Sequence, residues 1–245
     1  MLLQRILNTG YLSVEEIATW FDVTLQTARR DLTDLVESGK VRRCHGGVAP
    51  ALPSDSMSFR IRRGQNIEAK RRIAEKVADL VDDGSAVFID NGSTMEAVAH
   101  SLALRAKQLS VSTSSARIAA ELSDIEGFDV TVPSGRLRSG DSAILGPGAI
   151  KWAENSKFDI AIMTVAGLSN AGEMTSDSID EALVQQAVIR SAKRVIIAMD
   201  STKFGFVAPA PYCRLTDVSD LVVDAAPHPN LQRRIEMSKV RLHLV

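Results

Sequence analysis

The sequence has few of the residues that build metal sites and disulfide frameworks. Its 245 residues include only two cysteines, Cys44 and Cys213, and four histidines that are scattered along the chain. Neither a CxxC pair nor a Cys/His spacing typical of zinc ligands occurs, which argues against a structural zinc site and favours a reducing, cytoplasmic setting. We therefore expect no metal and no cofactor.

Long hydrophobic runs and an excess of either charge are also missing. No apolar run approaches the roughly 20 residues needed to span a bilayer, and the N-terminus lacks a basic-then-apolar export signal. We therefore expect a cytoplasmic protein with no membrane partner. The formal net charge is only −1, so any binding to nucleic acid must come from a local basic surface.

The overall composition is that of a soluble globular protein. Hydrophobic residues make up 45% of the chain and charged residues 24%. The length suffices for one large domain or for two unequal ones. The patterns along the chain favour two, because an all-helical opening gives way to alternating strand and helix patterns.

The first 38 residues read as three helices joined by short turns. Apolar residues recur at helical spacing over residues 2–7, and a capping box at residues 13–16 predicts the start of a second helix. Residues 22–23 form a tight turn. A third helix is expected over residues 25–38, where Gly39 closes it.

The third helix has the pattern of a DNA recognition helix, and residues 40–48 have that of a basic wing. Arginine and glutamine near the start of such a helix read guanine and adenine in the major groove, while a wing grips phosphate. The alternative is a small helical interaction module whose arginines only solvate a helix face. The residues expected to contact DNA are Thr24, Gln26, Thr27, Arg29, Arg30, Arg42, Arg43 and His45.

A hinge is expected after the wing, because residues 49–56 contain two prolines and several small polar residues. We therefore divide the chain into a winged helix-turn-helix domain over residues 1–52, a hinge and the start of a linking helix over residues 53–72, and an effector domain over residues 73–245. The basic runs at residues 60–63 and 70–72 are interpreted as solvated helix surface, and Gly84 as the stop of the helix that follows.

The second domain alternates short apolar runs with helical segments. Strands are expected at residues 87–90, 109–112, 128–132, 158–165, 194–199 and 220–223. This order predicts an α/β fold with a mainly parallel sheet that is covered on both faces. Ligands of such sheets bind at the carboxyl ends of the strands.

The segment at residues 86–99 reads as a buried strand, a polar turn and a helix. Gly92 permits close approach of a ligand, and Ser93 or Thr94 is expected to cap a helix that begins near Met95. The free amides and the dipole of that helix make a seat for an anion. The alternative is an ordinary turn in which the hydroxyl only caps the helix.

Polar loops follow several of the expected strands and suit a phosphorylated, hydroxyl-rich small molecule. Backbone amides near Ser93 and the Lys203 ammonium can hold a phosphate, while carboxylates can accept hydrogen bonds from sugar hydroxyls. The residues expected to contact the effector are Asp90, Asn91, Gly92, Ser93, Thr94, Thr113, Ser114, Ser115, Gly135, Arg136, Arg138, Gly167, Glu181, Asp200 and Lys203.

Two segments carry a family resemblance. The run from Val23 to Leu35, Val-Thr-Leu-Gln-Thr-Ala-Arg-Arg-Asp-Leu-Thr-Asp-Leu, followed by Gly39 and by Arg-Cys-His-Gly-Gly at residues 43–47, resembles the DeoR family of bacterial transcription regulators. Thr24 and Ala28 stand where that family has Ser and Ile, which are conservative changes. Asn91 stands where Ser or Gly is more typical, and residues 134–135 are Ser-Gly where a Gly pair is common.

The resemblance implies a repressor of carbohydrate-metabolism genes that binds double-stranded operator DNA and is released by a phosphorylated sugar or polyol. It also implies a C-terminal domain similar in fold to ribose-phosphate isomerases. Because paired half-sites need paired recognition helices, we expect a homo-oligomer, either a dimer or a tetramer.

Two other functions remain open at this point. One is a sugar-phosphate isomerase-like enzyme with an accessory N-terminal domain. Residues 165–169, Val-Ala-Gly-Leu-Ser, argue against it, because those enzymes carry an Asp-Gly-Ala-Asp-Glu loop at the corresponding position. The other is a DNA-binding protein whose second domain only oligomerises. The sequence favours the regulator and predicts no enzymatic activity.

Overall fold

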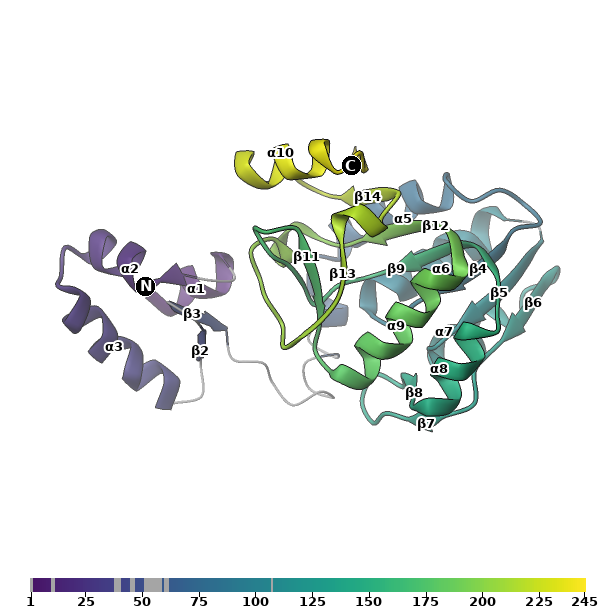
Figure 1. Cartoon of the computed structure of the whole chain (residues 1–245), viewed down its shortest axis with the longest axis horizontal. Helices are drawn as coiled ribbons and strands as arrows, with labels where there is room; N and C mark the ends of the chain where they lie inside the picture. The colour runs from purple at the N-terminus through teal and green to yellow at the C-terminus, as the bar shows by residue number, and fades with distance from the viewer. Residues whose placement is uncertain are drawn as a thin grey trace.

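The computed structural model describes residues 2–9, 12–37, 41–44, 47–50, 59, 62–106 and 108–245. Figure 1 shows a small N-terminal part and a larger C-terminal part. Each has a hydrophobic core of its own, in agreement with the expectation of two domains of different fold.

The N-terminal part is a winged helix-turn-helix. It contains α1 (Leu2–Thr9), α2 (Val14–Phe21) and α3 (Leu25–Glu37), which confirms the three expected helices. An antiparallel sheet in the order β1 (Leu12–Ser13), β3 (Gly47–Pro50) and β2 (Val41–Cys44) forms the wing and its base. Two-residue β1 was not predicted, because so short a segment has no periodicity of its own.

The start of α2 follows from its sequence. The Ser13 hydroxyl accepts a hydrogen bond from the Glu16 amide at 3.1 Å, and the Glu16 carboxylate accepts one from the Ser13 amide at 2.8 Å. This reciprocal pair is the predicted capping box and satisfies two amides that the helix itself cannot pair. Asp22 ends the helix in the left-handed conformation, with φ 52°, and so begins the turn into α3.

The C-terminal part is built on a seven-stranded parallel sheet. The strands follow the order β15 (Arg241–Leu244), β14 (Asp220–Val223), β12 (Ala192–Ala198), β9 (Phe158–Met163), β4 (Ala86–Ile89), β5 (Leu109–Thr113) and β6 (Phe128–Thr131). All but β15 were predicted. That strand lies at the edge of the sheet and carries Arg241 and His243, so it lacks the apolar run of a central strand.

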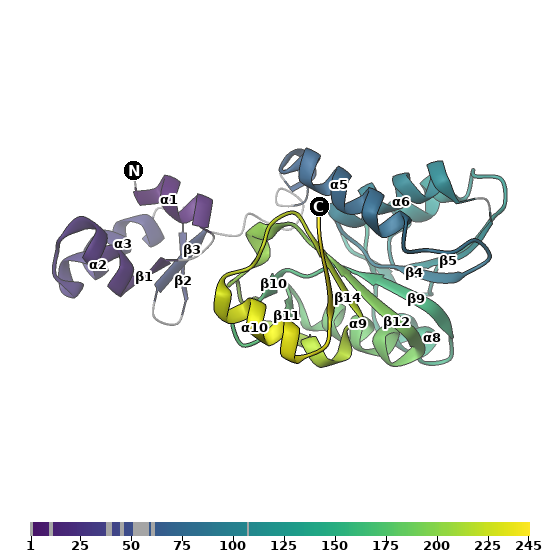
Figure 2. The same cartoon turned by 90° about the horizontal axis from the view of Figure 1, so that it is seen from above.

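Helices cover both faces of this sheet (Figure 2). One face packs against α5 (Ile67–Ala78), α6 (Ser93–Arg105) and α7 (Ala116–Leu122), and the other against α8 (Pro147–Glu154), α9 (Ile179–Ser191) and α10 (Pro229–Met237). Alternate residues of β4 serve the two cores. Val87 and Ile89 face the first set, and Phe88 packs with Trp152 and Phe158 on the second.

Several shorter strands lie outside the central sheet. Strands β7 (Arg136–Leu137) and β8 (Ile144–Leu145) pair as a two-stranded antiparallel ribbon. A separate antiparallel sheet contains β10 (Gly167–Leu168), β11 (Glu173–Ser176) and β13 (Ala210–Arg214). The 3₁₀ helices are η1 (Ser201–Lys203) and η2 (Leu215–Asp217). No helix in the described ranges is long and apolar enough to cross a membrane.

The structure corrects two details of the sequence reading. Helix α6 begins at Ser93 with Gly92 as its N-cap, so neither Ser93 nor Thr94 caps it through its side chain. The φ of 139° at Gly92 is one that L side chains rarely adopt. Helix α5 ends at Ala78, well before Gly84, which lies with φ 80° in the turn that leads to β4. The start of α5 at Ile67 lies within residues 53–72, where the start of a linking helix was expected.

The capping box generates a prediction about stability. Ser13→Ala removes the acceptor for the Glu16 amide, so it should lower the free energy of unfolding of the N-terminal part by about 1 kcal/mol. Glu15→Ala, an exposed change in the same turn, is the control and should cost less than about 0.5 kcal/mol. Hydrogen exchange of the α2 amides measures both, and equal protection in the two variants would contradict the capping role.

Candidate functional site

The candidate effector site lies where several parallel strands end together. The chain runs from β4 outward to β5 and β6, and then returns through β9 to the other side of β4. Such a reversal in strand order opens a place for a ligand beyond the carboxyl ends of the strands. Asp90 follows β4 and lies there. Its amide donates to the carbonyl of Ile162 at 2.9 Å, which ties the β4 loop to β9.

Asp90 is a buried carboxylate held by three donors. It accepts hydrogen bonds from the Asn91 amide and from Gln185 Nε2, both at 2.8 Å, and a longer one from the Thr164 amide at 3.4 Å. Burial raises the pKa of Asp90 to about 6, and these hydrogen bonds offset only part of that effect. Asp90 is therefore an acid that changes its charge close to neutral pH.

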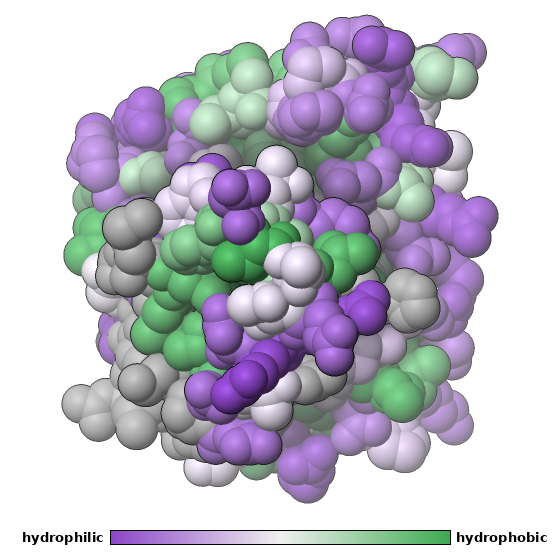
Figure 3. All heavy atoms as spheres, turned by 90° about the vertical axis from the view of Figure 1, so that its left-hand side faces the viewer, coloured by the Kyte–Doolittle hydropathy of each residue, from purple (hydrophilic) through white to green (hydrophobic). Residues whose placement is uncertain are grey.

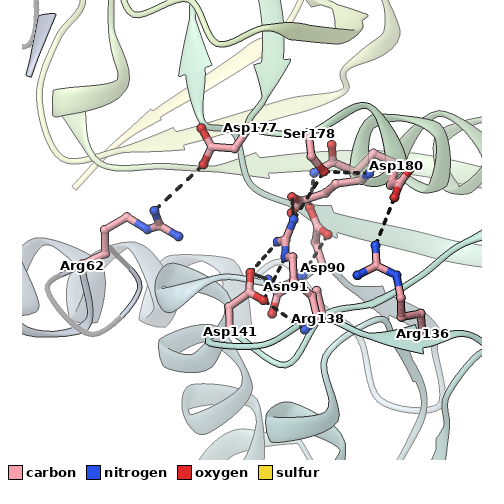
Figure 4. Close-up of polar contacts among 12 residues, drawn as sticks. Arg62, Asp90, Asn91, Arg136, Arg138, Asp141, Asp177, Ser178 and Asp180 are labelled. Carbon is pink, nitrogen blue, oxygen red and sulfur yellow. Dashed lines mark hydrogen bonds and ion pairs between the residues drawn. The ribbon is translucent and has the colours of Figure 1, made fainter. Parts of the chain in front are cut away.

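A single arginine joins the other carboxylates of the site (Figure 4). Arg138 Nε donates to Asp141 Oδ1 at 3.0 Å, and Arg138 Nη1 donates to Glu181 Oε2 at 2.9 Å. Asn91 Nδ2 donates to Asp141 Oδ2 at 2.9 Å and so links this group to the β4 loop. The resulting cluster comprises Asp90, Asn91, Arg138, Asp141, Glu181 and Gln185, which we call the acidic cluster.

The acidic cluster holds more carboxylates than its arginine neutralises. Burial raises the pKa of Glu181 to about 7, and although Arg138 opposes this shift, the charges of Asp90 and Asp141 add to it. Asp141 behaves differently. Burial raises its pKa, but the hydrogen bond and charge of Arg138 outweigh burial and lower the pKa overall. Arg138 thus keeps Asp141 ionised and leaves Asp90 and Glu181 near their titration points.

A second group of charged side chains lies around η1, the short helix that follows β12. Asp200 is buried and accepts from Asn66 Nδ2 at 3.2 Å and from the Thr202 amide at 3.1 Å. Burial lowers the pKa of the nearby Lys203, although the charge of Asp200 opposes that effect. Within the described residues, no hydrogen bond or ion pair is formed by Lys203 Nζ.

Lys70 of α5 belongs to this second group. Its ammonium donates to the carbonyls of Arg62 and of Gln65, the latter at 2.8 Å. Burial lowers the pKa of Lys70 to about 8, and the neighbouring charges of Lys203 and Arg62 lower it further, against the effect of Asp200. We call Lys70 and Lys203 the lysine pair.

The start of α6 has three backbone amides that donate to no described group. The first amide with a helical partner is that of Glu96, which donates to the Gly92 carbonyl at 2.9 Å. Among the residues that the structure describes, none accepts from the amides of Ser93, Thr94 or Met95. These three N–H groups and the positive end of the helix dipole lie where the sequence predicts an anion seat. A Cβ at Gly92 would lie 3.1 Å from the Thr164 side chain, so the loop passes close to β9.

Other predicted effector residues have structural partners already. The Ser115 hydroxyl caps α7 by accepting from the Ile118 amide at 3.4 Å, and Thr113 Oγ1 accepts from the Ser115 amide at 3.1 Å. Ser114 is buried beside them and its carbonyl pairs with the Ile144 amide at 2.6 Å. These residues position the loop that carries Asp141.

The remaining predicted residues lie outside the acidic cluster. Arg136 is exposed and pairs with Asp180 at 3.2 Å (Figure 4), and Gly135 is exposed before it. Gly167 is required by packing, because a Cβ there would lie 2.3 Å from the carbonyl oxygen of Phe206. The structure therefore brings Asp90, Asn91, Arg138 and Glu181 together but does not bring Gly135, Arg136 or Gly167 to them.

Sequence reasoning missed three buried residues of the site. Lys70 was interpreted as solvated surface, but it lies on the same helical stripe as Ile73 and Val77, a spacing that could have revealed it. In the same way, Gln185 lies on the buried face of α9, beside Ala182 and Val188. Asp141 lies in a loop whose sequence gives no such signal.

The candidate DNA interface is the start of α3. Ala28 and Leu32 are buried against the domain, whereas Gln26, Arg29 and Arg30 are exposed. Figure 3 views the molecule from the end that carries this domain, where hydrophilic and hydrophobic residues lie side by side on the surface.

The remaining residues of the predicted interface lie beside that helix and in the wing. Thr24 Oγ1 accepts from the Thr27 amide at 3.2 Å, as expected of a cap. Arg42 and Arg43 lie in β2, but their side chains, like all of His45, fall outside the described part of the structure. The assignment of the wing residues to phosphate contacts therefore remains a prediction.

Two family models match the chain. A DeoR-like helix-turn-helix domain matches residues 1–51, and a DeoR C terminal sensor domain matches residues 65–225. The HTH-type transcriptional repressor CsqR of Escherichia coli (strain K12) is 34% identical over 243 residues, which cover 99% of this chain and 93% of that protein. The glycerol-3-phosphate regulon repressor of the same organism is 32% identical over 245 residues, covering 99% and 96%.

A solved structure resembles the larger part more distantly. Ribose 5 phosphate isomerase A from Neisseria gonorrhoeae is 19% identical with a TM-score of 0.41, and the match covers 55% of this chain and 52% of that one.

The raised pKa values of Asp90 and Glu181 predict how stability depends on pH. Between about pH 4 and pH 7 the folded chain binds more protons at these groups than the unfolded chain does, so the free energy of unfolding should fall as pH rises, by roughly 3 kcal/mol for each group. Glu181→Gln should flatten this slope. Asp180→Asn, an exposed change on the same helix, should leave it as it is. Urea unfolding at several pH values tests this, and an unchanged slope in Glu181→Gln would rule out the assignment.

Proposed function

Because the chain belongs to the DeoR family of DNA-binding transcription regulators, we propose that it represses carbohydrate-metabolism genes and leaves its operator when a phosphorylated sugar or polyol occupies the sensor domain. In this proposal the protein acts in the cytoplasm as a homo-oligomer, since an operator with two half-sites needs two recognition helices. The names of relatives, among them a glycerol-3-phosphate regulon repressor, support the same class of effector.

The observation that carries the proposal is an excess of positive charge at the start of α6. Three free amides lie there, and Lys70 interacts electrostatically both with Glu96 of the same helical turn and with Lys203. Lys70 is buried and Lys203 is half-buried, and these two ammonium groups, which repel one another, are each stabilised by a bound anion. A phosphate group supplies the negative charge and the several acceptor oxygens that these donors can use.

The remainder of the effector is proposed to lie toward the acidic cluster. Carboxylate oxygens of Asp90 and Glu181 accept hydrogen bonds from hydroxyl groups, which a sugar or polyol provides in number. Residues 165–169, which contain no carboxylate, do not resemble a paired-acid catalytic loop, and the family favours regulation over isomerase chemistry. The effector is thus proposed to be bound and released without reaction.

Release from DNA requires that the effector distinguish two conformations. A ligand that binds both conformations with equal affinity does not change the equilibrium between them, however tightly it binds. A panel of phosphorylated sugars and polyols therefore tests the proposal in two steps. A true effector should raise the Tm of the full chain and should also dissociate the chain from its operator. Failure of every compound to do either would contradict the proposal.

The recognition helix generates a prediction about specificity. Arg30→Ala should weaken binding to an operator obtained by sequence selection by about 1 to 3 kcal/mol and should have little effect on random DNA, because it removes a contact to base edges. Arg43→Ala should weaken binding to both DNAs and lower the salt slope by about 1, because it removes a phosphate contact.

Fluorescence anisotropy at several salt concentrations separates these two effects. Arg72→Ala, an exposed change on α5, serves as the control and should leave both affinities unchanged. Equal losses on operator and random DNA for Arg30→Ala would falsify the base-reading role.

The lysine pair generates a prediction about the effector. Lys203→Met should weaken binding of a phosphorylated effector about tenfold, which corresponds to about 1.4 kcal/mol, and Lys193→Met, an exposed change, should have no effect. Binding to the wild-type chain should also weaken as pH rises above about 8, because Lys70 then loses its proton. Calorimetry between pH 7 and pH 9.5 measures both, and full affinity in Lys203→Met would show that the phosphate binds elsewhere.

A further inference from the structure

Two buried amide side chains in the acidic cluster each have an oxygen with no hydrogen-bond donor. Asn91 donates its Nδ2 to Asp141 and Gln185 donates its Nε2 to Asp90, at 2.9 and 2.8 Å. Asn91 Oδ1 and Gln185 Oε1 are buried acceptors that no described group satisfies. Both side chains are more than nine-tenths buried, since Asn91 is 5% exposed and Gln185 is 3% exposed.

The orientation of each amide follows from its neighbours. Turning either group over would place its oxygen against a carboxylate oxygen and lose the hydrogen bond. The carboxylates therefore hold both NH₂ groups and leave both oxygens for another partner. A buried acceptor without a donor costs free energy, and native proteins satisfy nearly all such atoms with protein, water or ligand.

The surroundings of these two oxygens restrict the partner to a donor. Asp90 and Glu181 are acceptors when ionised, and Arg138, the cation of the acidic cluster, already donates to Asp141 and Glu181. A carbonyl or carboxylate group of a ligand is itself an acceptor, so it cannot donate a hydrogen bond to either amide oxygen. A hydroxyl group can donate to an amide oxygen, and two hydroxyl groups can satisfy both.

The position of Asn91 connects this requirement to the phosphate. Asn91 directly precedes Gly92, the N-cap of α6, so its side chain begins one residue before the anion seat. A phosphate ester bound at the seat can therefore direct its carbon chain toward Asn91. Gln185 comes from α9, and its Nε2 donates to the carboxylate of Asp90, the residue before Asn91, at 2.8 Å.

We propose that Asn91 and Gln185 select the effector by accepting hydrogen bonds from two of its hydroxyl groups, so that a polyol phosphate is preferred over its keto or deoxy counterpart. This inference rests on the proposed function, because it assumes that a phosphorylated ligand occupies the same site. It adds the chemical group that the site distinguishes and the two side chains that do so.

Matched pairs of ligands test the proposal on the wild-type chain. Glycerol 3-phosphate has a hydroxyl where dihydroxyacetone phosphate has a carbonyl, and sorbitol 6-phosphate differs in the same way from the open-chain form of fructose 6-phosphate. Ribose 5-phosphate and its 2-deoxy analogue differ by one hydroxyl. In at least one pair the form with more hydroxyl groups should bind about tenfold more tightly or better, because the other form leaves a buried acceptor unpaired. Equal affinities in all three pairs would overturn the proposal.

Variants then assign the preference to the two side chains. Gln185→Met and Asn91→Ala should reduce the preference within the discriminating pair to less than about threefold. The preference is the ratio of two affinities measured on the same variant, so a uniform loss of affinity does not change it. Gln186→Met is the matched control, because this neighbouring glutamine contacts the carbonyl of Pro211 and not Asp90. It should keep the full preference.

The outcomes separate this inference from the proposed function. A preference that persists in both Gln185→Met and Asn91→Ala overturns the inference, since water alone would then satisfy the two oxygens. Binding of phosphate esters with no preference also overturns it and leaves the proposed function standing. If no phosphate ester binds and inorganic phosphate does not bind either, the proposed function fails and the inference fails with it.

Discussion

Burial of the Asp90 carboxylate is the constraint on which the sensor domain depends. A charge taken out of water is costly unless donors surround it, and here the donors come from separate segments of the chain. The Thr164 amide ties Asp90 to the end of β9, and Gln185 ties it to α9. Asn91 extends the connection to Asp141 and hence to Arg138. One carboxylate therefore fixes the relative positions of the two halves of the sheet and of a helix that covers it.

The same constraint divides the site into two regions of opposite character. The acidic cluster contains more carboxylates than its arginine neutralises, which keeps the pKa of Asp90 and of Glu181 near neutrality. The lysine pair has lowered pKa values, because burial outweighs the charge of Asp200, the carboxylate beside it. The amides at the start of α6 follow closely after Asn91 of the acidic cluster. An effector with a phosphate at one end and hydroxyl groups at the other matches this polarity, whereas a uniformly anionic or apolar molecule does not.

The sequence predicted those features that depend on local chemistry. The capping box at Ser13, the polar turn at Asp90 and the strands of the central sheet follow from short-range patterns. The cap of α6 was misplaced because a hydroxyl is the usual cap, and only the backbone geometry identifies Gly92. Lys70 and Gln185 were missed because the sequence does not show which groups pack against a polar residue on an otherwise apolar helix face. The partnership of Arg138 with Asp141 and Glu181 likewise depends on loops that meet only in the folded chain.

The contacts of Lys70 also bear on how occupancy of the sensor domain reaches the DNA-binding domain. Its ammonium holds the carbonyls of Arg62 and Gln65, in the turn through which the chain enters α5. Upstream of that turn, Phe59 is buried, and the Arg117 guanidinium lies 5.6 Å from the centre of its ring. Within the turn, Arg62 Nη1 lies 4.0 Å from Asp177 Oδ2. An anion beside Lys70 competes with those carbonyls for the same three N–H donors. Since a ligand shifts a conformational equilibrium only through contacts that differ between the two states, a phosphate bound as proposed would act through this turn on the segment that leads toward the recognition helix.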